Sequence, residues 1–142
     1  MVKSIYEIIT YAGKLRKTEE RIAYLREHNS APLKNIVIAT TDKNKIKFLL
    51  PAEAPPYTPS VHNENHGLLY REARKLKYFV EGWAPPGLKQ VKREQVFIEM
   101  LESIHRDDAK ILLQMITQKP FKGFTPEVIL AAFDYTLTEK SA

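Results

Sequence analysis

The chain has 142 residues, 44% of them hydrophobic, which suits one globular domain able to bury a core. It has no cysteine, which excludes disulfides, thiolate metal sites and thiol nucleophiles. The formal charge of +5 favours an anionic partner. No stretch approaches eighteen consecutive apolar residues and the start lacks the apolar run of a secretory signal, so we expect a cytoplasmic protein without a membrane span.

Three helices are predicted before residue 43. The first places an apolar stripe on one face, made by Ile5, Ile8, Ile9 and Ala12. Ser4 can cap this helix and Gly13 can end it, and a second helix starts at Thr18. The third segment is rich in β-branched residues, so a strand is an alternative. We favour a helix because Ser30 can cap it and Pro32 suits its first turn.

A long proline-rich loop is expected over residues 51–66. Three prolines force extended backbone there, at Pro55, Pro56 and Pro59. Loops of this length are functional or mobile, and we expect this one to lie across the helices with Tyr57 as an anchor. His62 and His66 could hold a divalent metal, but a solvated polar loop is the favoured interpretation. We therefore predict no metal and no cofactor.

Four more helices are predicted in the second half. Residues 67–82 read as one continuous helix, and the next, over residues 88–104, has four apolar residues facing inward, namely Leu88, Val91, Ile98 and Leu101. Asp107 or Asp108 opens another helix; because the two are adjacent they point about 100° apart and form no paired-carboxylate site. Thr125 caps the last helix. The fold class is therefore all-α, a single compact domain over residues 1–142 with six or seven short helices and a frayed tail at 137–142.

The sequence carries no recognisable catalytic motif. It has none of the glycine-rich nucleotide-binding patterns, no zinc-protease H-E-x-x-H and no G-x-S-x-G. Its five glycines are isolated and cannot build a phosphate cradle. We therefore predict that the protein is not an enzyme and has no catalytic residues.

The net charge lies in one segment. Residues 71–93 hold seven basic and two acidic residues, and the rest of the chain is balanced at 15 against 15. Cations neutralise phosphates and aromatic rings can stack on bases, and Tyr70, Tyr78 and Trp83 lie in or beside this segment. The alternative is a solvated helix face with the rings packed in the core. The candidate DNA contacts here are Arg71, Arg74, Lys75, Lys89, Lys92 and Arg93.

A second candidate contact region is the basic turn KPFKGF before the last helix. Lys119 and Lys122 can neutralise phosphates, and Gly123 lets backbone approach closely. Phe121 and Phe124 are interpreted as staples for the helix start, with wedges between bases as the alternative.

Two blocks of the chain resemble a known family. DDAKILLQMITQKPFKGFTPEVILAAF resembles the end of the N-terminal DNA-binding domain of ATP-dependent DNA ligases, especially the compact viral ones, in which two helices flank a short basic loop. IYEIITYAGKLRKTEERIAYLREHNSAPLKNIV is similar to the start of that domain. The lysine of the ligase K-x-D-G motif has no counterpart here, so the resemblance implies a stand-alone binding domain. The chain also resembles small uncharacterised proteins of tailed phages, which implies action in a host cytoplasm.

The resemblance implies a non-catalytic protein that contacts the phosphate backbone of duplex DNA without strong sequence preference. We expect the cations to converge on one continuous surface. The alternative is a small protein-binding adaptor that modulates replication, repair or host machinery, for which the exposed stretch APPYTPS would suit capture of a replication or host protein.

Overall fold

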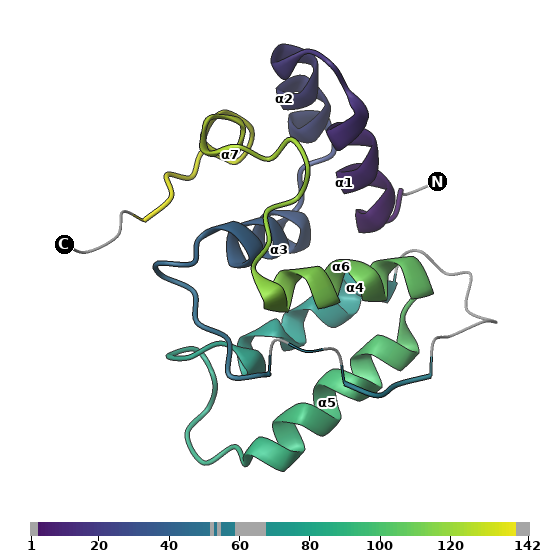
Figure 1. The fold of residues 1–142 in the computed structure, drawn as a ribbon, viewed down its shortest axis with the longest axis vertical. Coiled ribbons are helices and arrows are strands. Elements are labelled where there is room, and N and C mark those ends of the chain that lie inside the picture. The colour runs from purple at the N-terminus through teal and green to yellow at the C-terminus, as the bar shows by residue number, and fades with distance from the viewer. Residues whose placement is uncertain (1–2, 52, 54, 59–67, 139–142) are drawn as a thin grey trace.

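The computed structural model describes residues 3–51, 53, 55–58 and 68–138, and these residues form an all-α fold (Figure 1). No strand occurs among them. The helices are α1 (Ile5–Lys14), α2 (Thr18–Glu27), α3 (Ala31–Thr41), α4 (Leu68–Glu72), the 3₁₀ helix η1 (Ala73–Phe79), α5 (Gln90–Ser103), α6 (Arg106–Thr117) and α7 (Pro126–Phe133). The predicted fold class is confirmed.

The helices are stacked along the long axis of the molecule (Figure 1). α1, α2 and α7 lie at one end and α5 at the other, with α3 and α6 between them. α7 packs against α2, and α3 against α6. The rings of Phe79 and Phe97 meet edge to face, with their centroids 5.2 Å apart, and so join η1 to α5. One continuous apolar core runs through these contacts.

The predicted caps of α1, α3 and α7 are present, whereas α6 is capped by His105 and not opened by Asp107 or Asp108. The Ser4 hydroxyl accepts from the Glu7 N–H and the Glu7 carboxylate accepts from the Ser4 N–H, which completes a capping box. Ser30 and Thr125 cap α3 and α7 in the same way, each accepting from the backbone N–H three residues later. The segment with β-branched residues is therefore a helix, as favoured over a strand.

The predicted continuous helix over residues 67–82 is wrong. Its described part consists of one short α-helix followed by η1. A 3₁₀ helix rises about 2.0 Å per residue instead of 1.5 Å, so the chain reaches further. Val80 is then extended and pairs with Phe48 in an isolated antiparallel bridge. Pairing with this distant segment ends the helix before Gly82.

Val91, predicted to face the core, is 78% exposed. α5 begins only at Gln90, and the buried side chain of its first turn is Arg93, which reaches back to the end of η1. The apolar periodicity predicted that Val91 would be the buried residue in this turn. The buried residue is instead Arg93, whose charged side chain donates hydrogen bonds to backbone carbonyls.

The first two residues of the predicted frayed tail are held in place. α7 ends at Phe133, and Asp134 adopts a left-handed conformation at φ 54°. The buried Asp42 carboxylate then accepts hydrogen bonds from the Tyr135 hydroxyl at 2.5 Å and the Thr138 hydroxyl at 3.0 Å, and Leu137 packs on the core. Residues 139–142 lie outside the described residues.

The described part of the proline-rich segment has no regular structure. Tyr57 packs on the core as predicted, and the Thr58 N–H donates to Glu102 at 2.8 Å. His62 and His66 lie outside the described residues. Among the helices that are described, none has both the length and the apolar character needed to cross a membrane.

Candidate nucleic-acid interface

The basic turn Lys119–Phe124 lies directly on the end of α1. A β-carbon added to Gly13 would sit 2.8 Å from the Lys122 carbonyl oxygen, too close for any side chain. Gly13 was predicted to end the first helix, but α1 continues through Lys14. The absence of a side chain at Gly13 is what allows the turn to approach the helix.

Gly123 is explained by a protein contact. Its φ is +84°, a conformation that glycine adopts without strain. The Arg21 side chain fills the space beside it, with Nε 2.7 Å from where a β-carbon would lie. Arg21 also donates to the carbonyls of Ala12 at 2.8 Å and Leu15 at 2.5 Å. Close approach by a ligand is therefore not needed to account for this glycine.

Phe121 and Phe124 anchor the turn. They are 4% and 3% exposed, and their rings meet edge to face with centroids 5.9 Å apart. Rings packed in the core are not available as wedges between bases, so the staple interpretation is the one the packing supports.

Three lysines from separate segments line one groove beside this turn. Lys14, Lys110 and Lys122 lie on α1, on α6 and in the turn, and the groove has a volume of about 400 Å³. Tyr6 and Gln114 contribute to its lining, and none of its lining residues is a carboxylate. We call this the loop groove. The Gln114 amide fixes the turn above it by donating to the Lys119 carbonyl at 3.0 Å.

The cations of the loop groove are largely free to meet an anion. Within the described part of the chain, Lys14 and Lys122 are exposed and form no ion pair, and the same holds for Lys119 in the adjoining turn. Lys110 lies 3.7 Å from Asp107, but its side chain is 67% exposed, and ion pairs of this kind contribute little. Lys14 and Lys110 were not sequence-predicted contacts, because only the packing of α1 on α6 brings them together.

The predicted contacts on α4, η1 and α5 differ in availability. Arg74, Lys89 and Lys92 are exposed and unpaired among the described residues. The Lys75 ammonium lies 2.6 Å from the Glu72 carboxylate, and Arg71 lies 3.7 Å from it. That carboxylate offsets part of the positive charge on this surface.

Arg93 was predicted as a DNA contact but is buried and structural. Its Nε donates to the Tyr78 carbonyl at 2.9 Å, and its terminal nitrogens donate to Gln90 and to the Leu88 carbonyl. Because Arg93 is buried and each nitrogen of its guanidinium already donates a hydrogen bond within the protein, it is poorly placed to meet a phosphate, and it leaves the candidate set.

Tyr70 is also a structural residue. Its hydroxyl donates to the Lys3 carbonyl at 2.7 Å, and burial raises the pKa of Tyr70 above the ordinary tyrosine value. Tyr78 is partly buried against the core, with the Lys77 ammonium 5.5 Å from its ring centre. Of the candidate stacking residues Tyr70, Tyr78 and Trp83, Trp83 alone is well exposed, at 50%.

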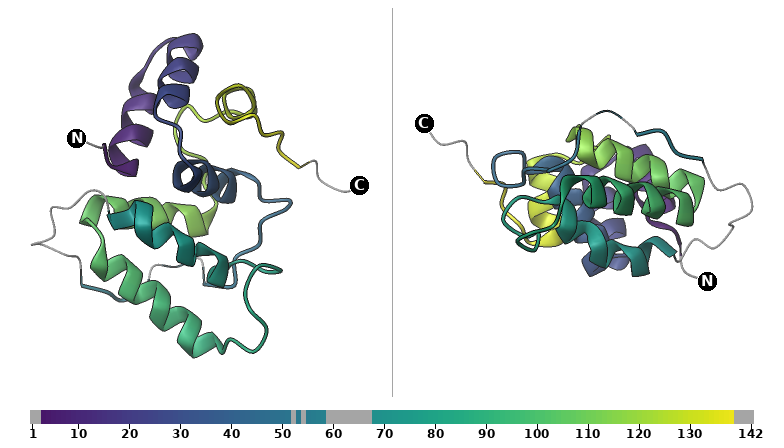
Figure 2. Two further views of the ribbon diagram at one scale, coloured as in Figure 1. Left: turned by 180° about the vertical axis from the view of Figure 1, so that it is seen from behind. Right: turned by 90° about the horizontal axis from the view of Figure 1, so that it is seen from below.

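The basic turn and the start of α5 lie far apart. Figure 1 places the start of α5 at one end of the long axis and the turn between α6 and α7 in the opposite half, and the reverse view in Figure 2 agrees. Lys89 and Lys92 therefore belong to a different region from Lys119 and Lys122. The expected single convergence is replaced by two cationic regions.

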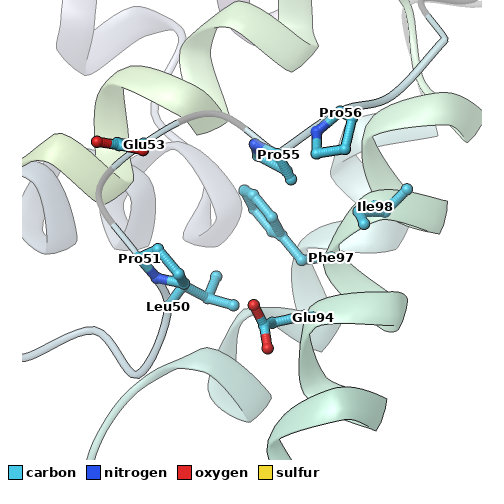
Figure 3. Close-up of a pocket in the computed structure, with 8 residues that line it drawn as sticks. All are labelled: Leu50, Pro51, Glu53, Pro55, Pro56, Glu94, Phe97 and Ile98. Carbon is cyan, nitrogen blue, oxygen red and sulfur yellow. The ribbon is translucent and has the colours of Figure 1, made fainter.

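A pocket of different character lies between the Pro55–Pro56 dipeptide and α5 (Figure 3). Its volume is about 290 Å³, and Phe97 and Ile98 of α5 form its apolar wall. Glu53 and Glu94 also line it, and neither is in an ion pair within the described residues. This pocket would repel a polyanion.

A model of a family of unknown function, DUF6433, matches residues 8–121 of the chain. The chain belongs to this family. The match runs from α1 to Phe121 and so takes in Lys14 and Lys110 of the loop groove. No curated protein and no solved structure matches the chain. Among the described residues, no group of three or more metal-binding side chains could hold an ion.

Proposed function

We propose that this DUF6433 member is a non-catalytic, cytoplasmic DNA-binding protein that contacts the phosphate backbone of a duplex. The observation that carries the proposal is the loop groove, where Lys14, Lys110 and Lys122 converge from three segments onto a surface lined by no carboxylate. A lysine ammonium neutralises phosphate without reading sequence, so this site favours binding of any duplex.

The resemblance to ligase DNA-binding domains supports the same site. The resemblance implies that the turn Lys119–Phe124 meets the duplex, and this turn forms one wall of the loop groove through Phe121 and Lys122. The backbone of this turn is held by two buried phenylalanines and by a hydrogen bond from Gln114. Lys119 and Lys122 are therefore carried on an ordered backbone. Lys89 and Lys92, at the start of α5, would provide a second phosphate-binding region for longer DNA.

The proposal is tested by measuring the affinity for a blunt duplex of arbitrary sequence across a salt series. Three groove lysines predict that log K falls against log salt with a slope of about −3, because each neutralised phosphate contributes about 0.9. Two duplexes of unrelated sequence should bind alike. Affinity that does not change between about 50 and 200 mM salt, or no binding at the lower salt, would overturn the proposal.

The Figure 3 pocket favours a second candidate, the adaptor that modulates replication, repair or host machinery. An apolar wall beside Glu53 and Glu94 suits an apolar protein segment that carries a positive charge. If the protein is such an adaptor, Glu94→Lys should abolish its effect on replication, repair or host machinery in cells. Charge reversal in the loop groove would leave that effect intact, which separates the two candidates.

A further inference from the structure

Trp83 is half exposed at a place where the backbone is firmly held. The Trp83 and Ala84 N–H groups both donate to the Val80 carbonyl, at 3.1 and 3.0 Å, and Gly82 supplies the φ of +87° that the turn requires. The Leu49 N–H donates to the Phe79 carbonyl at 2.7 Å and fixes the start of this turn to a distant segment. The exposure of the indole is therefore built into the fold.

The indole stands at the rim of a small pocket between α3, η1 and α6. Its volume is about 200 Å³, below the range of about 300–1,000 Å³ for pockets that enclose drug-sized ligands, so it suits one flat ring. Apolar side chains form much of its lining, including Ala39, Leu76, Val80 and Met115. We call this the Trp83 pocket.

Two cations and no carboxylate line the Trp83 pocket. Arg74 and Lys77 are exposed, and neither forms an ion pair in the described part of the chain. The neighbouring carboxylate of Glu81 is not part of the lining. An apolar, aromatic contact flanked by cations that form no ion pair matches a base that is still attached to its phosphates.

We propose that Trp83 stacks an unpaired nucleobase, so that the protein prefers DNA with a single-stranded segment over a blunt duplex. This inference rests on the proposed function for its ligand class, but it uses a different surface from the loop groove. The bases of an intact duplex are already stacked on one another and cannot engage the indole. An overhang or gap would free a base for it, while Arg74 and Lys77 meet the flanking phosphates.

Trp83 is the only tryptophan in the chain, so its fluorescence reports on the pocket directly. Titration with a thymidine oligonucleotide of about 12 nucleotides should quench the emission. A duplex with a single-stranded overhang should bind about tenfold more tightly than the blunt duplex. Trp83→Ala should abolish this preference and leave blunt-duplex affinity unchanged, whereas Trp83→Phe, which keeps a ring, should retain most of it.

Tyr11→Ala is the matched control, because Tyr11 is also 50% exposed and lies on α1, away from the Trp83 pocket. It should leave the overhang preference intact. The inference is overturned if the oligonucleotide does not quench Trp83, if Trp83→Ala keeps the preference, or if polyglutamate quenches equally well, which would indicate an acidic peptide. Blunt-duplex binding without quenching refutes this inference alone; quenching without blunt-duplex binding refutes the proposed duplex function alone.

Discussion

At the scale of single residues, two glycines with almost the same backbone conformation serve different purposes. Gly123 at φ +84° is covered by the Arg21 guanidinium, whereas Gly87 at φ +86° has no atom within 4 Å of where a β-carbon would lie. Any side chain in this conformation costs about 1 kcal/mol. At Gly123 a side chain would also displace Arg21 from the carbonyls of Ala12 and Leu15.

Gly123→Ala should therefore lower the free energy of unfolding by about 1–2 kcal/mol more than Gly87→Ala, because it costs the two hydrogen bonds of Arg21 as well as the conformational strain. Urea denaturation of both variants measures the difference. Equal losses would show that Arg21 does not hold the turn to α1.

Tyr135 gives the C-terminal segment a pH dependence of known sign. Burial raises the pKa of Tyr135, and the hydrogen bond that it donates to Asp42 raises it further. The folded protein therefore keeps this proton at a pH where the unfolded chain has lost it. The resulting stability is fully present below the unfolded pKa of about 10 and is lost as pH rises through the folded value.

The stability of the wild-type protein should accordingly fall as the pH rises above about 10, and fall less steeply in Tyr135→Phe, which cannot ionise. Burial also raises the pKa values of Tyr24 and Tyr70, so the variant should retain part of the decline. Thermal unfolding over this range measures both slopes. Identical slopes would contradict the role of the hydrogen bond to Asp42.

At the scale of elements, the start of α1 is capped from α6. The buried Asp108 carboxylate accepts from the Tyr6 N–H at 3.0 Å, so an acid in the first turn of α6 also satisfies the first turn of α1. This contact joins α1 to α6, the two helices that contribute Lys14 and Lys110 to the loop groove.

Asp108→Ala should destabilise the fold by about 2 kcal/mol, since it leaves a buried helix N–H without this acceptor. Asp107→Ala, its neighbour on the more exposed side of α6, should cost about 0.5 kcal/mol, through the helix dipole and the weak contacts of Asp107 with His105 and Lys110. Denaturant unfolding of the pair provides the comparison. A loss at Asp107 as large as that at Asp108 would refute the inter-helix cap.

Helix starts that depend only on neighbouring residues could be predicted from the sequence. Ser4, Ser30 and Thr125 each cap a helix through a contact three residues away, which a sequence displays directly. The start of α5 was not, because Arg93 turns inward to reach the Tyr78 carbonyl fifteen residues earlier. Nor was the end of η1 at Phe79, since Val80 pairs with Phe48, which is distant in the sequence.

At the scale of the whole molecule, the candidate site was only half predictable. The basic turn with Lys119 and Lys122 stands out in the sequence, but Lys14 and Lys110 are nearly a hundred residues apart and only packing joins them. The basic segment 71–93 was the clearest signal in the sequence because its charges lie close together along the chain. In the fold, Glu72 offsets two of its cations and Arg93 is buried.

The most direct measurement is the salt dependence of duplex affinity for two double variants of equal net charge, Lys14→Glu with Lys122→Glu and Lys43→Glu with Lys45→Glu. All four lysines are exposed, so both variants should fold, and only the first pair lines the loop groove. We expect the groove variant to lose affinity and about two units of salt slope, because two phosphate contacts are removed, while the control keeps its slope. Equal losses in the two variants would show that total charge, and not the groove, attracts the DNA.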